Sequence, residues 1–163
     1  MTEPRFNLTD PKLTPVIQAM YGLEAPIRNS GLEPRLRELV KTRASQINGC
    51  AYCIDMHTKD ARAHGETEQR LYALNAWRET PFYTDRERAA LEWTEQLTLI
   101  AEKGVPDEVY ARVREHFTDE ELVKLTLAIV QINGYNRFAI SFRALPGSYE
   151  PTQHPRAATT AHA

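Results

Sequence analysis

The chain of 163 residues is long enough for one compact domain, and its 42% hydrophobic and 26% charged residues are typical of a globular protein. A formal net charge of −2, with basic and acidic residues interleaved, excludes the broad positive field that nucleic-acid binding needs. The first residues lack the charged head and apolar run of a secretory signal. The most apolar stretch, residues 122–142, contains too many polar residues for a membrane span. A cytoplasmic protein is therefore expected.

Helical periodicity and capping residues run through the chain, and no segment shows sustained alternation of period two, so an all-α fold is expected. The first helix should follow Asp10 and run to about Asn29, and the second should begin at Pro34 and end near Asn48. Further helices are expected over about 50–64, after Thr67 and after Pro106, and the helix after Thr67 carries Leu71, Leu74 and Trp77. Two more are expected after capping boxes, one formed by Thr84 with Glu87 and one by Thr118 with Glu121. The last of these helices should reach Leu145.

Residues 1–147 are expected to form one helical domain, and residues 148–163, with two prolines and an Ala/Thr/His ending, a disordered tail. Segments 38–49 and 121–134 share the motifs Glu-Leu-Val-Lys and Gln-Ile-Asn-Gly, which indicates an internal helix-pair duplication. The second copy is apolar on more than one face, which favours contacts between subunits. Its Tyr135, Phe138 and Phe142 stand where the first copy has Cys50, Cys53 and His57.

The two cysteines of the chain, Cys50 and Cys53, are three residues apart, and His57 follows four residues later. On a helix this spacing places all three side chains on one side. A helix N-terminus would lower the pKa of the Cys50 thiol, whereas a neighbouring imidazole would activate Cys53, and the spacing does not decide between them. Glu38, on the preceding helix, is the best candidate to orient His57.

These residues can reduce a peroxide. If Cys53 attacks a peroxide oxygen it becomes a sulfenic acid, which Cys50 can convert to a disulfide with release of water. A dithiol donor would then restore both thiols by exchange.

The pattern of Glu38, an eleven-residue gap, Cys50-x-x-Cys53, and His57 after three more residues resembles the catalytic signature of AhpD-like alkylhydroperoxidases in the carboxymuconolactone decarboxylase superfamily. The likeness extends through residues 61–62, 65, 70–71, 77–79, 86–91 and 136–140. One departure is Tyr52, because some members carry a histidine there and tyrosine is a poor base near neutral pH.

The resemblance implies an all-helical fold that assembles as homo-trimers or homo-hexamers and acts as a thiol peroxidase. It implies that Cys53 attacks the peroxide, that Cys50 resolves the sulfenic acid, and that a Glu38–His57 relay activates the thiol. It also implies reduction by a dithiol such as a lipoylated protein. No cofactor or metal is expected.

The sequence also has to be compared with what other functions of these residues would require. The two cysteines and His57 could bind zinc if His64 or His116 supplied a fourth ligand, but no second CxxC motif exists. Haem attachment is excluded because Ile54, not histidine, follows the second cysteine. A lactone decarboxylase would need no cysteine pair, and a general dithiol oxidoreductase would use the same residues. A non-catalytic helical interaction module with buried cysteines is a further alternative.

Glu38 also has a structural alternative. It is flanked by Arg35, Arg37 and Lys41, and a glutamate in such a helix is most often a solvated partner of those charges. Only the resemblance favours a catalytic role for this carboxylate.

Overall fold

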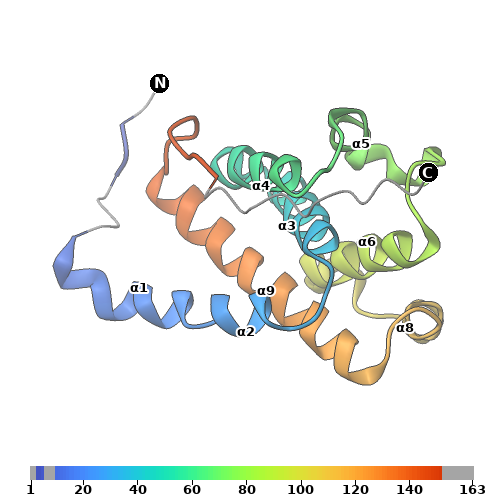
Figure 1. The fold of residues 1–163 in the computed structure, drawn as a ribbon. Helices are drawn as coiled ribbons and strands as arrows, with labels where there is room; N and C mark the ends of the chain where they lie inside the picture. Colours follow the sequence, from blue (N-terminus) through green and yellow to red (C-terminus); the bar gives the residue numbers. More distant parts are fainter. Residues whose placement is uncertain (1–2, 6–9, 152–163) are drawn as a thin grey trace.

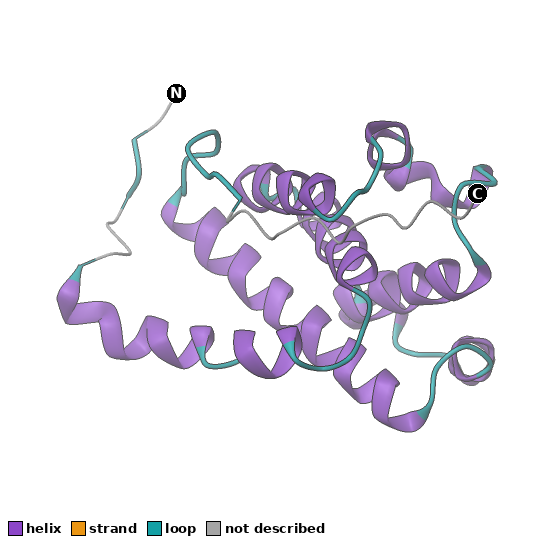
Figure 2. Ribbon diagram, in the orientation of Figure 1, coloured by secondary structure: helices purple, strands orange, loops and turns teal. Residues whose placement is uncertain are grey.

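A computed structural model describes residues 3–5 and 10–151, and every regular element in that part of the chain is helical (Figures 1 and 2). In chain order, with η for 3-10 helices, the elements are η1 (Pro11–Leu13), α1 (Thr14–Tyr21), α2 (Glu24–Arg28), α3 (Pro34–Asn48), α4 (Ala51–Ala63), α5 (Glu68–Tyr72), η2 (Leu74–Glu79), α6 (Asp85–Thr98), α7 (Ile100–Lys103), α8 (Asp107–Arg114) and α9 (Asp119–Phe142). The expected all-α class is confirmed. Within those residues, no helix combines the length and the apolar character needed to cross a membrane.

Both predicted capping boxes are present. The Thr84 hydroxyl accepts from the backbone N–H of Glu87, whose carboxylate accepts from the backbone N–H of Thr84. Thr118 and Glu121 do the same at the start of α9. Each box satisfies two amide groups that a helix start leaves unpaired, which explains why the sequence locates α6 and α9 so well.

The first expected helix is wrong as a single element, because the chain forms η1, α1 and α2 instead. Pro26 explains the break: it has no N–H to donate to the Gly22 carbonyl four residues earlier, and its ring would clash with that carbonyl. The helix expected after Thr67 is likewise split into α5 and η2, and α9 ends at Phe142, before Leu145.

Helix α3 lies at the centre of the molecule and packs against α4, α6 and α9 (Figure 1). One side of it contributes to a core between α6, α8 and α9, and another packs on α4, α5 and η2. The largest core cluster contains Leu36, Val40, Trp93, Leu125 and Ile129, and a second contains Leu39, Leu74, Trp77 and Leu91. Because α3 is held on several sides, its polar residues are fixed as well.

The segment after α9, residues 143–151, is called here the C-terminal strap and folds back onto α4. The Lys59 ammonium donates to the carbonyls of Gly147 at 3.4 Å and Tyr149 at 2.8 Å. The Gly147 N–H donates to Asp55 Oδ2 at 3.0 Å, and the Tyr149 hydroxyl donates to Asp60 Oδ1 at 2.7 Å. Of the expected tail, residues 148–151 belong to this strap, and residues 152–163 lie outside the described part.

Candidate active site

The two cysteines lie at the junction of α3 and α4. Helix α3 ends at Gly49, whose φ of 69° is in the left-handed region that glycine adopts without strain. Cys50 then takes the N-cap position of α4, and Cys53 lies in its first turn. Both are free thiols, and each is only 1% exposed. The positive end of the α4 dipole is therefore next to Cys50.

This junction is anchored to α9 by buried amides. Asn48 Nδ2 donates to Asn136 Oδ1 at 2.8 Å, and Asn136 Nδ2 donates to Ser45 Oγ at 3.0 Å. The Asn136 side chain also lies close enough to both cysteines to lower the pKa of each thiol. A buried amide bonded in several directions tolerates little movement, so it fixes the cysteines relative to α9.

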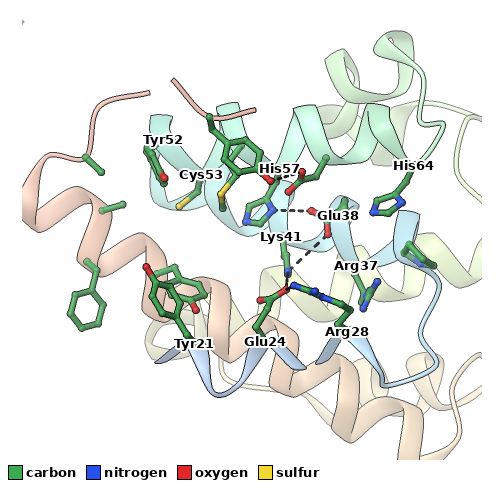
Figure 3. A pocket seen from close by; sticks show the side chains of 18 of the residues that line it. Tyr21, Glu24, Arg28, Arg37, Glu38, Lys41, Tyr52, Cys53, His57 and His64 are labelled. Atoms are coloured by element: carbon green, nitrogen blue, oxygen red, sulfur yellow. Dashed lines mark hydrogen bonds and ion pairs between the residues drawn. The ribbon is translucent and has the colours of Figure 1, made fainter. Parts of the chain in front are cut away.

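His57 and Glu38 form a hydrogen-bonded pair between α4 and α3, with Nδ1 of the imidazole 2.8 Å from Oε2 of the carboxylate (Figure 3). A carboxylate can only accept, so Nδ1 carries the proton. The other ring nitrogen, Nε2, is buried and has no hydrogen-bond partner among the described residues. In the neutral ring Nε2 is a proton acceptor, which is the state a general base requires.

The Glu38 carboxylate remains charged although it is buried. Burial alone would raise its pKa, but the hydrogen bond from His57 and the charges of Lys41 and Arg37 hold the pKa below its ordinary value. The Lys41 ammonium lies between two carboxylates, 3.9 Å from Glu38 and 3.8 Å from Glu24 (Figure 3). At neutral pH an ionised Glu38 therefore fixes the tautomer of His57.

The two thiols differ in acidity because they share a hydrogen bond. The bond from Cys53 lowers the pKa of Cys50 to about 7, against the opposing effect of burial. The same bond, together with burial, raises the pKa of Cys53. Cys50 is thus the more easily ionised sulfur, and Cys53 needs a base to become a thiolate.

A cavity of about 900 Å³ opens beside this pair. Cys53 and His57 line it, together with charged side chains from α2, α3 and α4, whereas Cys50 is not among the lining residues. The opposite wall is formed by aromatic side chains of α9, namely Tyr135, Phe138 and Phe142. A substrate in this cavity would therefore reach the sulfur of Cys53 and Nε2 of His57.

Comparisons with known proteins agree with this architecture. Residues 11–96 match the family model described as the carboxymuconolactone decarboxylase family. The chain is 54% identical over 125 residues to the uncharacterised protein YdfG of Bacillus subtilis (strain 168), covering 77% of this chain and 85% of that protein. This chain belongs to the carboxymuconolactone decarboxylase family.

A crystal structure of a relative places it among the AhpD-like members of that family. A protein of unknown function from Agrobacterium tumefaciens, described as a candidate antioxidant defence protein AhpD, has a TM-score of 0.85 and 45% identity over 90% of this chain and 100% of its own. A peroxidase-related protein with an AhpD core from Ralstonia eutropha JMP134 has a TM-score of 0.73 and 20% identity over 82% of this chain and 72% of its own, which shows a shared fold alone. The expected family membership is confirmed.

The structure brings the four predicted site residues of this family member together in two neighbouring pairs: Glu38 is hydrogen-bonded to His57, and Cys50 lies beside Cys53. Tyr52, the departure from the signature, also lines the cavity, and burial raises the pKa of its phenol. Like the family's histidine at this place it could donate a hydrogen bond, but it is not a base near neutral pH.

In the described part of the chain, the candidate zinc ligands Cys50, Cys53 and His57 do not form one metal-binding group. Among the described residues, one group has the geometry to hold a metal ion: Glu38, His57 and Asp60, whose donor atoms lie within 4.8 Å of one another. Neither cysteine belongs to it. His64 lines the cavity, but the His116 carbonyl accepts from Arg86 at a different place in the fold.

Sequence reasoning missed three polar side chains of the cavity, Lys41, Asp60 and Tyr149. Asp60 had a usable signal, because it follows His57 by three residues and therefore shares a helix face with it. Lys41 looked like an ordinary surface charge, and Tyr149 fell in the expected tail, so neither carried a local signal.

Proposed function

We propose that this protein is a thiol-dependent peroxidase that reduces organic hydroperoxides, with Cys53 as the attacking sulfur. The observation that supports this most is the state of His57. Glu38 holds its Nδ1 at 2.8 Å, and within the described part of the chain Nε2 has no hydrogen-bond partner, beside the cavity that Cys53 also lines. A base aimed at the space where a thiol and a substrate meet is the arrangement that nucleophilic catalysis requires.

In the proposed reaction, Nε2 of His57 takes the proton of the Cys53 thiol while Glu38 stabilises the imidazolium. The thiolate attacks the terminal oxygen of the hydroperoxide, the O–O bond breaks, and the alcoholate takes a proton from His57 to leave as an alcohol. Cys53 is then a sulfenic acid. Cys50 attacks its sulfur, a disulfide forms, and the hydroxyl leaves as water. Each cycle uses two electrons from the two thiols, which a dithiol donor restores.

A second candidate is a dithiol oxidoreductase without specificity for peroxides. The pKa of about 7 for Cys50 favours it, because a sulfur that ionises near neutral pH at a helix N-terminus is suited to attack a disulfide. In that case Cys50 would attack first and Cys53 would resolve the mixed disulfide.

We also propose that the protein is cytoplasmic, that its reductant is a dithiol such as a lipoylated protein, and that it assembles as homo-trimers or homo-hexamers. Exposed apolar residues on α9 support assembly: Val123 is 69% exposed and Val130 is 56% exposed. The helix-pair duplication within one chain is part of the same proposal. Light scattering on the purified protein would give the number of subunits.

The deciding experiment titrates the reduced protein with hydrogen peroxide and with cumene hydroperoxide while free thiols and intact mass are followed by rapid quench. We expect loss of two thiols and about two mass units per chain. The rate should exceed that of Cys53→Ser at least about a hundredfold. Cys50→Ser should keep the first attack and leave a sulfenic acid that dimedone traps. If Cys50→Ser instead abolishes the first attack and Cys53→Ser keeps it, the roles of the two sulfurs are reversed, whereas two thiols that react with a disulfide but not with either peroxide favour the second candidate function.

A further inference from the structure

Asp60 is a second carboxylate beside the imidazole of His57. It lies one helical turn after His57 on α4, and its carboxylate oxygen is within 4.8 Å of the donor atoms of both His57 and Glu38. The Tyr149 hydroxyl, from the C-terminal strap, donates to Asp60 Oδ1 at 2.7 Å. Both side chains line the cavity that contains Cys53. The relay described above makes no use of them.

The ion pairs of the cavity single out Asp60. Glu24 is within 4 Å of Lys41 and Arg28, and Glu38 is within 4 Å of Lys41. Asp60, in contrast, forms no ion pair with a lysine or arginine among the described residues. It is therefore the carboxylate near the imidazole whose charge is not already matched by a neighbouring cation.

Most of the other charged and titratable groups around Asp60 come from four segments of the chain, and Tyr21 and Tyr135 add two phenols. Helix α3 contributes Arg37, Glu38 and Lys41, α4 contributes Tyr52, Cys53, His57 and His64, α2 contributes Glu24 and Arg28, and the strap contributes Tyr149. When the Cys53 proton moves to Nε2 of His57, a buried imidazolium appears, and the nearest unmatched anion within the described residues is Asp60.

We propose that Asp60 is a positioning residue of the relay, which stabilises protonated His57 as a second counterion, and that Tyr149 acts through Asp60 by holding its carboxylate in place. This rests on the proposed function, in which His57 accepts the thiol proton. The proton starts on Sγ of Cys53 and ends on Nε2 of His57; Asp60 and Tyr149 exchange no proton in this step.

The electrostatics of Asp60 agree with this assignment. Burial is the main cause that raises its pKa, and the charge of Glu38 adds to that effect, whereas the hydrogen bond from Tyr149 and the charges of His57 and Lys41 lower it. A carboxylate that is costly to ionise beside a like charge gains when a cation forms next to it. The Tyr149 hydroxyl keeps it available in the charged form.

The test follows the ionisation of Cys53 in a Cys50→Ser background by thiolate absorbance as a function of pH. Asp60→Asn should move the midpoint upward by about one pH unit, because His57 becomes a poorer acceptor. Asp60→Glu keeps the carboxylate and should bring the midpoint most of the way back to that of the Cys50→Ser parent. Tyr149→Phe should move the midpoint in the same direction by less. Adding Tyr149→Phe to Asp60→Asn should change nothing further, because Tyr149 acts through Asp60.

Glu24→Gln is the matched control, since it removes the same charge from the same cavity at a carboxylate paired with Lys41 and Arg28. It should not raise the midpoint. A midpoint that is unchanged or lowered in Asp60→Asn would overturn the proposal, as would an equal rise in Glu24→Gln. Circular dichroism and thermal melts establish that each variant is folded, and Asp60→Glu provides a charged variant should Asp60→Asn fail to fold.

His57→Ala separates this inference from the proposed function. If His57→Ala leaves the Cys53 midpoint unchanged, the relay itself is absent and the proposed function fails. If His57→Ala raises the midpoint but Asp60→Asn does not, only the role of Asp60 is wrong. In the His57→Ala background, Asp60→Asn should produce no further rise.

Discussion

The two walls of the cavity differ in chemistry. The wall from α3 and α4 carries the sulfur, the imidazole and the carboxylates, whereas the α9 wall is formed by Tyr135, Phe138 and Phe142. By the predicted duplication these aromatic residues occupy the places of Cys50, Cys53 and His57. Under the proposed function, the α3–α4 pair supplies the reacting groups, and α9 supplies shape and an apolar environment.

The difference between the two walls has an energetic consequence for folding and for the site. Buried charged groups such as Glu38 and Lys41 lose solvation and must be compensated by each other, so the α3–α4 wall contributes less to folding stability than an apolar wall would. The aromatic side chains lower the polarity of the same space, which strengthens the interaction of Glu38 with His57. Perturbed, costly groups in a cavity are typical of functional sites.

The largest effect on the rate of peroxide reduction should come from removing the proposed base, His57, from the α3–α4 wall, called here the polar wall. His57→Ala should lower the second-order rate constant for peroxide reduction by about a hundredfold to ten thousandfold at pH 7, because Cys53 loses its proton acceptor. Raising the pH should recover part of the loss, since hydroxide then ionises the thiol. Stopped-flow measurement of thiol oxidation checks this.

His64→Ala is the matched control, because His64 is a second histidine lining the same cavity. It should change the rate by less than about twofold, which is within the range of a surface-type substitution. Equal losses in the two variants would show that the polar wall acts by bulk charge and not through an oriented imidazole.

Replacing the orienting carboxylate should have the next largest effect. Glu38→Gln keeps the size of the side chain but removes its charge, and its amide can present either an oxygen or an N–H to Nδ1. The rate constant should fall by about tenfold to a hundredfold, as for other groups that orient a catalytic histidine. A pH–rate profile is the measurement. A profile identical to that of the unmodified protein would remove Glu38 from the mechanism.

The sequence predicted that Cys50, Cys53 and His57 lie close together because their spacing is local. Cys50, Cys53 and His57 lie within two turns of one helix, so their proximity follows from helical geometry alone. Glu38 was different. Its charged neighbours favoured a solvated role, but in the fold α3 is enclosed by α4, α6 and α9, which buries Glu38, Arg37 and Lys41 together. That burial is a tertiary property that no local pattern contains.

The capping boxes and the C-terminal strap show the same difference between local and long-range signals. Thr84 and Thr118 signal their helices through partners three residues away, and those signals are correct. Tyr149 is placed by contacts with Asp60 and Lys59, about ninety residues earlier in the chain, so its segment looked unstructured. Long-range contacts of this kind require the structure.

Replacing Cys53 should have a smaller effect, which is seen in the alkylation rate of Cys50. In the unmodified protein, alkylation of Cys50 should rise with pH and reach half of its limiting rate near pH 7, because the bond from Cys53 lowers the pKa of Cys50 to about 7. Cys53→Ala removes that donor and should shift the midpoint toward the ordinary value, which makes alkylation at pH 7 about tenfold slower. Peptide mass spectrometry identifies the alkylated cysteine.

Cys53→Ser is the control for this measurement, because its hydroxyl can still donate to Cys50 and should preserve most of the reactivity. A midpoint that is the same with alanine and serine at position 53 would assign the acidity of Cys50 to the helix N-terminus alone.

The smallest effect should come from the aromatic wall, and it should depend on the substrate. Phe138 packs near Phe142, with ring centroids 6.2 Å apart, and lines the cavity. Phe138→Ala should raise KM for cumene hydroperoxide by about fivefold, because apolar contact area is lost. The constants for hydrogen peroxide should stay unchanged, since that molecule is too small to reach both walls.

Ser141→Ala tests whether this effect belongs to the cavity, because Ser141 lies on the same helix but is exposed and does not line the cavity. It should alter neither substrate's KM. The thiolate titration of Cys53 should also be the same in Phe138→Ala as in the unmodified protein, because the aromatic wall carries no charge. A large loss with hydrogen peroxide in Phe138→Ala would mean that α9 controls the reacting groups directly, and the two walls would then act as one unit.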